Sequence, residues 1–150
     1  MASTFRADVV TALVAILNAQ RTATPDLLRG VWSARPGAYN ELPLAFVGDR
    51  SETITHDSGT RTRDMAGLQV FLVDSWSDSE QTASRLDVLV DLLVDRFTDA
   101  HSFLPNRLIE MTEVTDTELE VASKAEGQPP RVYPAVVISF ARTQIKEGRQ

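Results

Sequence analysis

Residues 60–99 read TRTRDMAGLQVFLVDSWSDSEQTASRLDVLVDLLVDRFTD, and this run decides the fold. Its first part is a long strand with a polar start and the apolar end LQVFLV. Its second part has the 3.6-residue spacing of an amphipathic helix, with apolar residues on two sides. The strand is longer than a small core needs, and the helix has more apolar surface than one core face needs. Both features indicate a subunit that buries its surplus surface against other copies of the same chain.

The composition is that of one globular domain spanning residues 1–150. Hydrophobic residues make up 43% of the chain and charged residues 24%, near the globular norm. The chain has no cysteine, which excludes disulfides, Cys-ligated metals and thiol nucleophiles. No apolar stretch approaches the ~20 residues that span a bilayer, and no secretory signal is expected at the N-terminus.

The charge balance argues against nucleic-acid binding. The formal net charge is −6, and lysine occurs only at Lys124 and Lys146. Tight binding to a phosphate backbone needs clustered Lys and Arg side chains. A protein that stays near DNA without adhering to it remains compatible with this balance.

The first half of the chain predicts a helix followed by a long β-hairpin. The helix is expected over 4–21, and a short strand over 31–34. Extended chain starts at Leu44 and runs to His56, and Asp57-Ser58-Gly59 supplies a turn in which glycine adopts positive φ. The partner strand runs back over 60–74. The hairpin is apolar at its root and polar at its tip, so its polar half is expected to form an arm that rests either on its own domain or on a neighbour.

The second half predicts one more helix and the remaining strands. Ser77 and Glu80 have capping-box spacing at the start of the helix. Its core face is expected to contain Leu86, Leu89, Val90, Leu93 and Phe97. Strands are expected over 107–114 and 118–121, joined by a turn at 115–117, and over 132–143, with a solvated tail KEGRQ. The predicted fold class is α/β (α+β), a mostly antiparallel sheet with a long β-hairpin arm packed by two main helices.

No pattern of catalytic residues stands out. The aspartates of the second helix recur every four residues and spiral across the face opposite the core: Asp87, Asp91, Asp95 and Asp99. A metal site would draw ligands from a second acidic cluster, which the sequence lacks, so a solvated helix face is the favoured interpretation. His56 and His101 lack the positioned partners of a general base. We therefore expect no enzyme activity, no cofactor and no metal.

Two surfaces are candidates for subunit contacts. Val88 and Leu92 lie on adjacent turns of the acidic helix face, where they are either tolerated singly or part of an interface. The arginines of the hairpin tip are either solvated or placed against the acidic helix of the next copy. The predicted contact residues are Thr53, Thr55, Arg61, Arg63, Val88, Asp91, Leu92, Asp95 and Arg96.

The order of elements resembles the tail terminator proteins of long-tailed bacteriophages over nearly the whole chain. The segments that prompt the comparison are FRADVVTALVAIL, LQVFLVDSWSDSEQTASRLDVLVDLLVDRF and RVYPAVVISFART. The resemblance implies a single tail-terminator-like domain, a structural virion protein at the head-proximal end of the tail, assembled in the host cytoplasm. It also implies a homohexameric ring that caps the tail tube and joins tail to head, with the tail tube protein and a head–tail connector as partners.

Further consequences of the resemblance are that DNA passes through the ring without specific binding, and that no membrane is involved. An acidic balance would discourage DNA from adhering there. Two alternatives stay open: a head–tail connector or other tail-completion protein, and a small cytoplasmic enzyme or ligand-binding domain with its site near Trp32, Tyr39 and His56. A DNA-binding module ranks third, because the scarcity of lysine argues against the salt-sensitive DNA affinity that it predicts.

Overall fold

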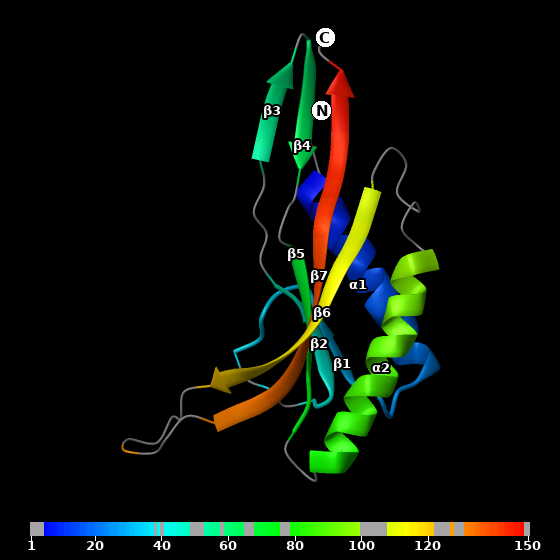
Figure 1. The fold of residues 1–150 in the computed structure, drawn as a ribbon, viewed down its shortest axis with the longest axis vertical. Coiled ribbons are helices and arrows are strands. Elements are labelled where there is room, and N and C mark those ends of the chain that lie inside the picture. The colour runs from blue at the N-terminus through cyan, green and yellow to red at the C-terminus, as the bar shows by residue number, and fades with distance from the viewer. Residues whose placement is uncertain are drawn as a thin grey trace.

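The computed structural model describes residues 5–37, 39, 41–48, 53–57, 59–64, 68–75, 79–99, 108–121, 127 and 131–148. These residues form two helices and a seven-stranded, mostly antiparallel sheet, so the predicted α+β class is confirmed (Figure 1). The elements in chain order are α1 (Phe5–Ala23), β1 (Gly30–Trp32), β2 (Leu44–Val47), β3 (Thr53–Asp57), β4 (Thr60–Asp64), β5 (Leu68–Val73), α2 (Ser79–Asp99), β6 (Leu108–Val121) and β7 (Arg131–Gly148).

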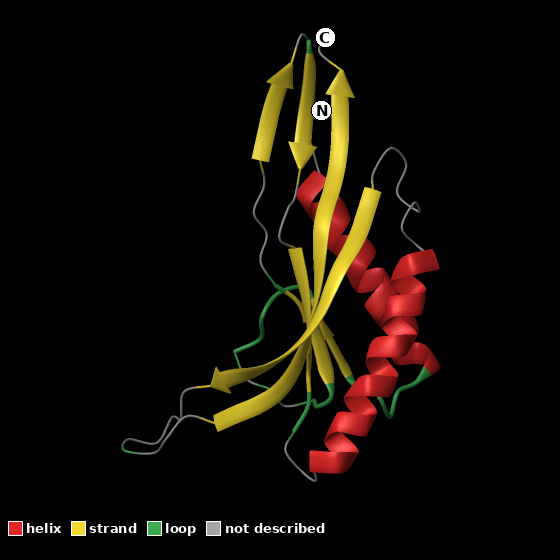
Figure 2. Cartoon of the chain, in the orientation of Figure 1, coloured by secondary structure: helices red, strands yellow, loops and turns green. Residues whose placement is uncertain are grey.

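Both helices pack on one face of the sheet (Figure 2). We call this the helix face, and its opposite the open face. Apolar residues of α1 and α2 share one buried cluster with Val70 of β5 and Ile138 of β7. The predicted core face of α2 is confirmed, because its five apolar residues are all buried. Ser77, the predicted helix cap, lies outside the described residues. No described helix is long and apolar enough to cross a membrane.

The predicted hairpin is present, and its two described parts, the root and the tip, share one register. Leu44 pairs with Val73 at the root, and Asp57 pairs with Thr60 at the tip. The same offset between paired residues holds in both halves, so β2 with β3 and β5 with β4 are the two legs of one ribbon. Gly59 has a φ of 88°, the left-handed conformation that the predicted turn needs.

Strand β7 is the centre of the sheet and corrects one prediction. One edge of β7 pairs with β5 and then with β4, and the other edge pairs with β6. Three residues of the expected solvated tail, 146–148, are therefore part of β7, where Lys146 pairs with Thr62 and Gly148 with Thr60, and the last two residues lie outside the described residues. The tail prediction was wrong because main-chain pairing does not require apolar side chains. The structure we call the arm, defined as β3, β4 and residues 144–148, thus has three strands.

Strand β6 corrects a second prediction. The turn expected at 115–117 does not form, and Leu108–Val121 is one strand of 14 residues. Thr115 and Thr117 pair with Val137 and Ala135, inside the ladder with β7. Its irregularity lies earlier, between Glu110 and Glu113. The polar stretch was mistaken for a turn because β6 carries exposed polar side chains while its backbone is held by β7.

Candidate functional site

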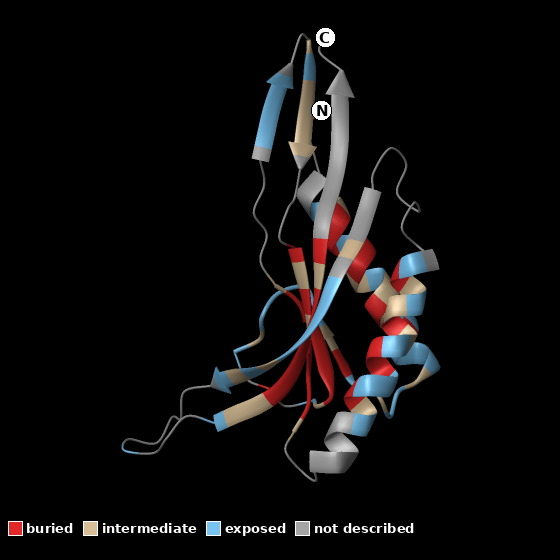
Figure 3. Ribbon diagram, in the orientation of Figure 1, coloured by how far each residue is buried: buried red, intermediate tan, exposed pale blue. Residues whose placement is uncertain are grey.

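The arm projects past both helices, and the described side chains of β3 and β4 form no apolar core there (Figure 3). The described side chains of β3 are exposed, and those of β4 are exposed or half-buried. Ile54, a large apolar residue, is 49% exposed. A small sheet without a hydrophobic face is marginal in water. The arm therefore has the properties of an element that is covered by another molecule.

The predicted arm residues lie together. Arg61 pairs with His56 and Arg63 with Ile54, so these four side chains share one face of the ribbon. Thr55 is exposed in the middle of β3 and Thr53 begins the strand, opposite Asp64. Arg61 and Arg63 also have interactions within the chain.

The outer face of α2 carries the predicted acidic stripe. Asp91 and Asp95 are exposed, as is Asp87, and Leu92 is half-buried. Val88 is 46% exposed on the same helix. The geometry agrees with the predicted surface, and the role of these residues in subunit contacts stays a prediction.

Arg96 has a partner inside its own chain. Its Nε donates a hydrogen bond to Oε1 of Gln20 at 2.6 Å, and Gln20 is 2% exposed. The Gln20 amide in turn donates to Oγ1 of Thr24 at 2.7 Å. This chain of hydrogen bonds ties α2 to the end of α1. It gives Arg96 a structural role beside the predicted subunit contact.

Sequence reasoning missed an ion pair at the end of β5. Asp74 is 1% exposed, and its Oδ2 accepts a hydrogen bond from Nε of Arg85 at 3.0 Å and forms a salt bridge with Nη2 at the same distance. Its Oδ1 accepts the Ser75 N–H at 2.7 Å. This ion pair ties the residue that follows β5 to α2. The available signal was an acid placed directly after an apolar strand, where a buried carboxylate needs a partner.

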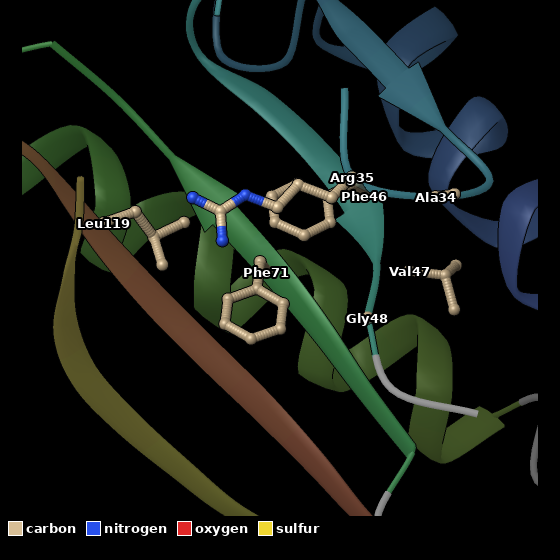
Figure 4. A pocket seen from close by; sticks show the side chains of 7 residues that line it. All are labelled: Ala34, Arg35, Phe46, Val47, Gly48, Phe71 and Leu119. Atoms are coloured by element: carbon tan, nitrogen blue, oxygen red, sulfur yellow. The ribbon is translucent and has the colours of Figure 1, made fainter. Parts of the chain in front are cut away.

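The open face carries a second apolar cluster and a hollow of about 450 Å³. Figure 4 shows Phe46 and Phe71 beside this hollow, with Arg35 reaching toward Leu119 of β6. The two phenylalanine rings stack with centroids 4.9 Å apart. Arg35 Nη2 donates to the backbone oxygen of Glu120 at 3.0 Å, which links the loop after β1 to β6.

The residues of the alternative ligand site do not come together. Trp32 is 46% exposed on β1, and His56 is exposed in the arm. Tyr39 is 7% exposed in the second apolar cluster, where it makes an edge-to-face contact with Tyr133. His101 lies outside the described residues. Among the residues that are described, no group of three or more His, Asp or Glu could hold a metal ion.

The structure thus places the predicted contact residues on two separate surfaces, the arm and the outer face of α2. No protein-family model and no curated protein matches this chain. The functional inference therefore depends on the fold, on these two surfaces and on the edges of the sheet.

Proposed function

We propose that this protein is a structural virion component, a ring-forming tail terminator of a long-tailed bacteriophage that caps the tail tube and joins it to the head. The observation that carries the proposal is the arm, a three-stranded projection without a buried described side chain on β3 or β4. An arm of this kind is stabilised when it lies on a neighbouring subunit.

The overall architecture supports the same proposal. The resemblance noted from the sequence implies a small α/β domain with an opening helix, a long hairpin and a second helix, and the fold agrees with that order. A ring needs two different surfaces on each subunit, because its interface is heterologous. The arm and the acidic outer side of the molecule are two such surfaces. The net charge of −6 suits a channel through which DNA passes without adhering.

One observation favours a second function. The hollow on the open face is lined by Phe46, Phe71 and Leu119, with a guanidinium at its edge, and its size is that of a small-molecule site. A ligand-binding domain would be a monomer or dimer and would bind its ligand in this hollow. A head–tail connector or other tail-completion protein would use the same surfaces as a terminator, with different neighbours in the virion.

The test is the solution mass by light scattering across a concentration series. A mass near six times the 16.5 kDa chain supports the ring. The double variant Arg61→Glu/Arg63→Glu should reduce the mass toward that of a monomer, while Arg21→Glu/Arg29→Glu, which reverses two exposed arginines outside the arm, should leave it unchanged. Circular dichroism of both variants checks that the fold is retained.

The second arm of the experiment adds purified tail tubes. A terminator that is monomeric in isolation should still bind to the ends of the tubes, seen by electron microscopy. A monomer that does not bind tubes at any concentration contradicts the proposal and favours the ligand-binding function instead.

A further inference from the structure

Three described strands, β1, β3 and β6, lie at edges of the sheet, and the edges of β3 and β6 complement each other. β6 pairs with β7, and no other described strand pairs with it. β3, in the arm, pairs with β4 alone among the described strands. An open edge presents unpaired N–H and C=O groups, which a further strand can satisfy.

The edge formed by β6 is acidic along its whole length. Its described side chains are all exposed or half-buried. The strand contains no basic residue and five carboxylates, Glu110, Glu113, Asp116, Glu118 and Glu120. Two β6 edges brought together would set these acids against each other, which is destabilising. This edge therefore resists a second β6 and accepts a neutral or basic strand.

The edge formed by β3 is of the opposite kind. Its sequence TITHD is rich in β-branched residues, and its one acid, Asp57, lies at the tip. It has neither the lysine nor the proline that commonly protects an edge strand. Arg61 and Arg63 lie on β4 directly behind it. Two strand spacings, roughly 10 Å, separate β4 from a strand added to β3, which is close to the screening length at physiological salt.

The faces of the two edges can be assigned through β7. Residues that are paired directly across antiparallel strands share a face. Val136 and Ile138 of β7 belong to the cluster under the helices, and they pair with Asp116 and Val114. Val114 and Asp116 are therefore on the helix face.

Their neighbours Thr115 and Thr117 consequently lie on the open face. β5 and β4 pair with the other edge of β7 in one register, Leu68 with Phe140 and Asp64 with Gln144. Leu68 belongs to the cluster under the helices, so Thr62 lies on the helix face, and Arg63 with its partner Ile54 lies on the open face. Thr55, the next residue along β3, is therefore on the helix face.

We propose that β3 of one copy adds to the free edge of β6 in the next copy, so that one sheet continues across the subunit boundary. The inference rests on the ring proposed above. Rotation about a ring axis keeps the open face of every copy on the same side. Because β3 and β6 run in opposite directions within one chain, the added strand is antiparallel to β6. The two edges differ, so the contact is heterologous and repeats from copy to copy.

Cysteine cross-linking tests this pairing directly, because the natural chain has no cysteine. A chain with Thr55→Cys is mixed with a second, differently tagged chain and treated with a short bismaleimide. The second chain carries one cysteine, either on the helix face (Val114→Cys or Asp116→Cys) or on the open face (Thr115→Cys or Thr117→Cys). The matched control is Val88→Cys on α2, since Val88 and Val114 are both 46% exposed.

The expected result is several-fold more cross-linked dimer with at least one of the helix-face cysteines than with either open-face cysteine, because alternate side chains of a strand point to opposite faces. Preference for the open-face cysteines would mean that the neighbouring sheet is turned over, which a ring does not allow, and would overturn the proposal. Cross-linking to Val88→Cys instead would place the arm on the acidic helix and would also overturn it.

The mass of the same mixtures separates this inference from the proposed function. A mass near six subunits without a β3–β6 cross-link overturns the edge pairing and leaves the ring in place. The predicted cross-link in open chains that never close and never bind tail tubes supports the pairing and contradicts the terminator function. A monomer that forms no cross-link, even with tail tubes added, contradicts both.

Discussion

Replacing Gly48 by alanine tests how closely the end of β2 packs against the ring of Phe71. A Cβ built on Gly48 would lie inside van der Waals contact with Cε2 of Phe71 and 3.0 Å from its Cδ2. The backbone cannot easily retreat, because the Gly48 N–H donates to the Gln69 oxygen at 2.7 Å. The ring is held in turn by its stack on Phe46, which is 2% exposed.

The expected loss of stability follows from these contacts. Overpacking by one methyl group costs about 1–3 kcal/mol, and disturbing an aromatic pair forfeits about 0.5–1.5 kcal/mol of the same total. Alanine also lowers the entropy of the unfolded chain, which offsets about 0.4–1 kcal/mol. The net expectation is a destabilisation of about 1–2 kcal/mol. For a chain of this size, that corresponds to a fall in Tm of roughly 2–8 °C.

The assay is urea denaturation followed by circular dichroism at one fixed protein concentration, since assembly would make stability depend on concentration. The matched control is Gly37→Ala, because a Cβ on Gly37 meets no atom within 4 Å. This control should be neutral or slightly stabilising.

A double-mutant cycle with Phe71→Ala then isolates the contact. Once the ring is gone, Gly48→Ala should no longer destabilise, so the double variant should lose less stability than the two single variants together. A Gly48→Ala variant as stable as the parent, or full additivity with Phe71→Ala, would refute the reasoning.

Three further changes test the packing. Arg85→Met removes the partner of the buried Asp74 carboxylate and should destabilise by about 1–3 kcal/mol in urea denaturation, at the modest end because Arg85 itself is 36% exposed. Leu93→Ala, at a fully buried position of α2, should lose about 2–5 kcal/mol, whereas Leu92→Ala on its half-buried neighbour should lose clearly less; equal losses would contradict the assigned helix face. Tyr39→Phe should leave Tm unchanged or raise it, because the buried Tyr39 hydroxyl has no hydrogen-bond partner among the described residues, and a marked fall would reveal one.

Much of the fold could be predicted because its signals are local. The core positions of α2 recur at helical spacing, and each of them is buried. The turn at Gly59 is encoded by three adjacent residues, and it fixes the register of the whole hairpin from Leu44 to Val73. A short turn sets the pairing because each further pair follows from the one before it.

The candidate contact surfaces were predictable to a lesser extent. The acidic outer face of α2 and the exposed arm could be predicted from the residue spacing of the helix and the hairpin. Asp91 and Thr55 are exposed in the structure, as expected. The partners of Arg85 and Arg96 were not predictable. Asp74 lies 11 residues from Arg85 and Gln20 lies 76 residues from Arg96, so only packing brings each pair together.

The sequence by itself determined the two amphipathic helices and the hairpin, since each depends on neighbours within a few residues or on one turn. Only the tertiary structure decided that the polar residues 144–148 are the third strand of the arm and that β6 is one continuous edge strand. Both depend on the ladder of β7, whose partners are distant in sequence. A strand held by main-chain hydrogen bonds can carry almost any exposed side chain, so composition alone does not reveal which polar segments pair and which edges of the sheet remain open.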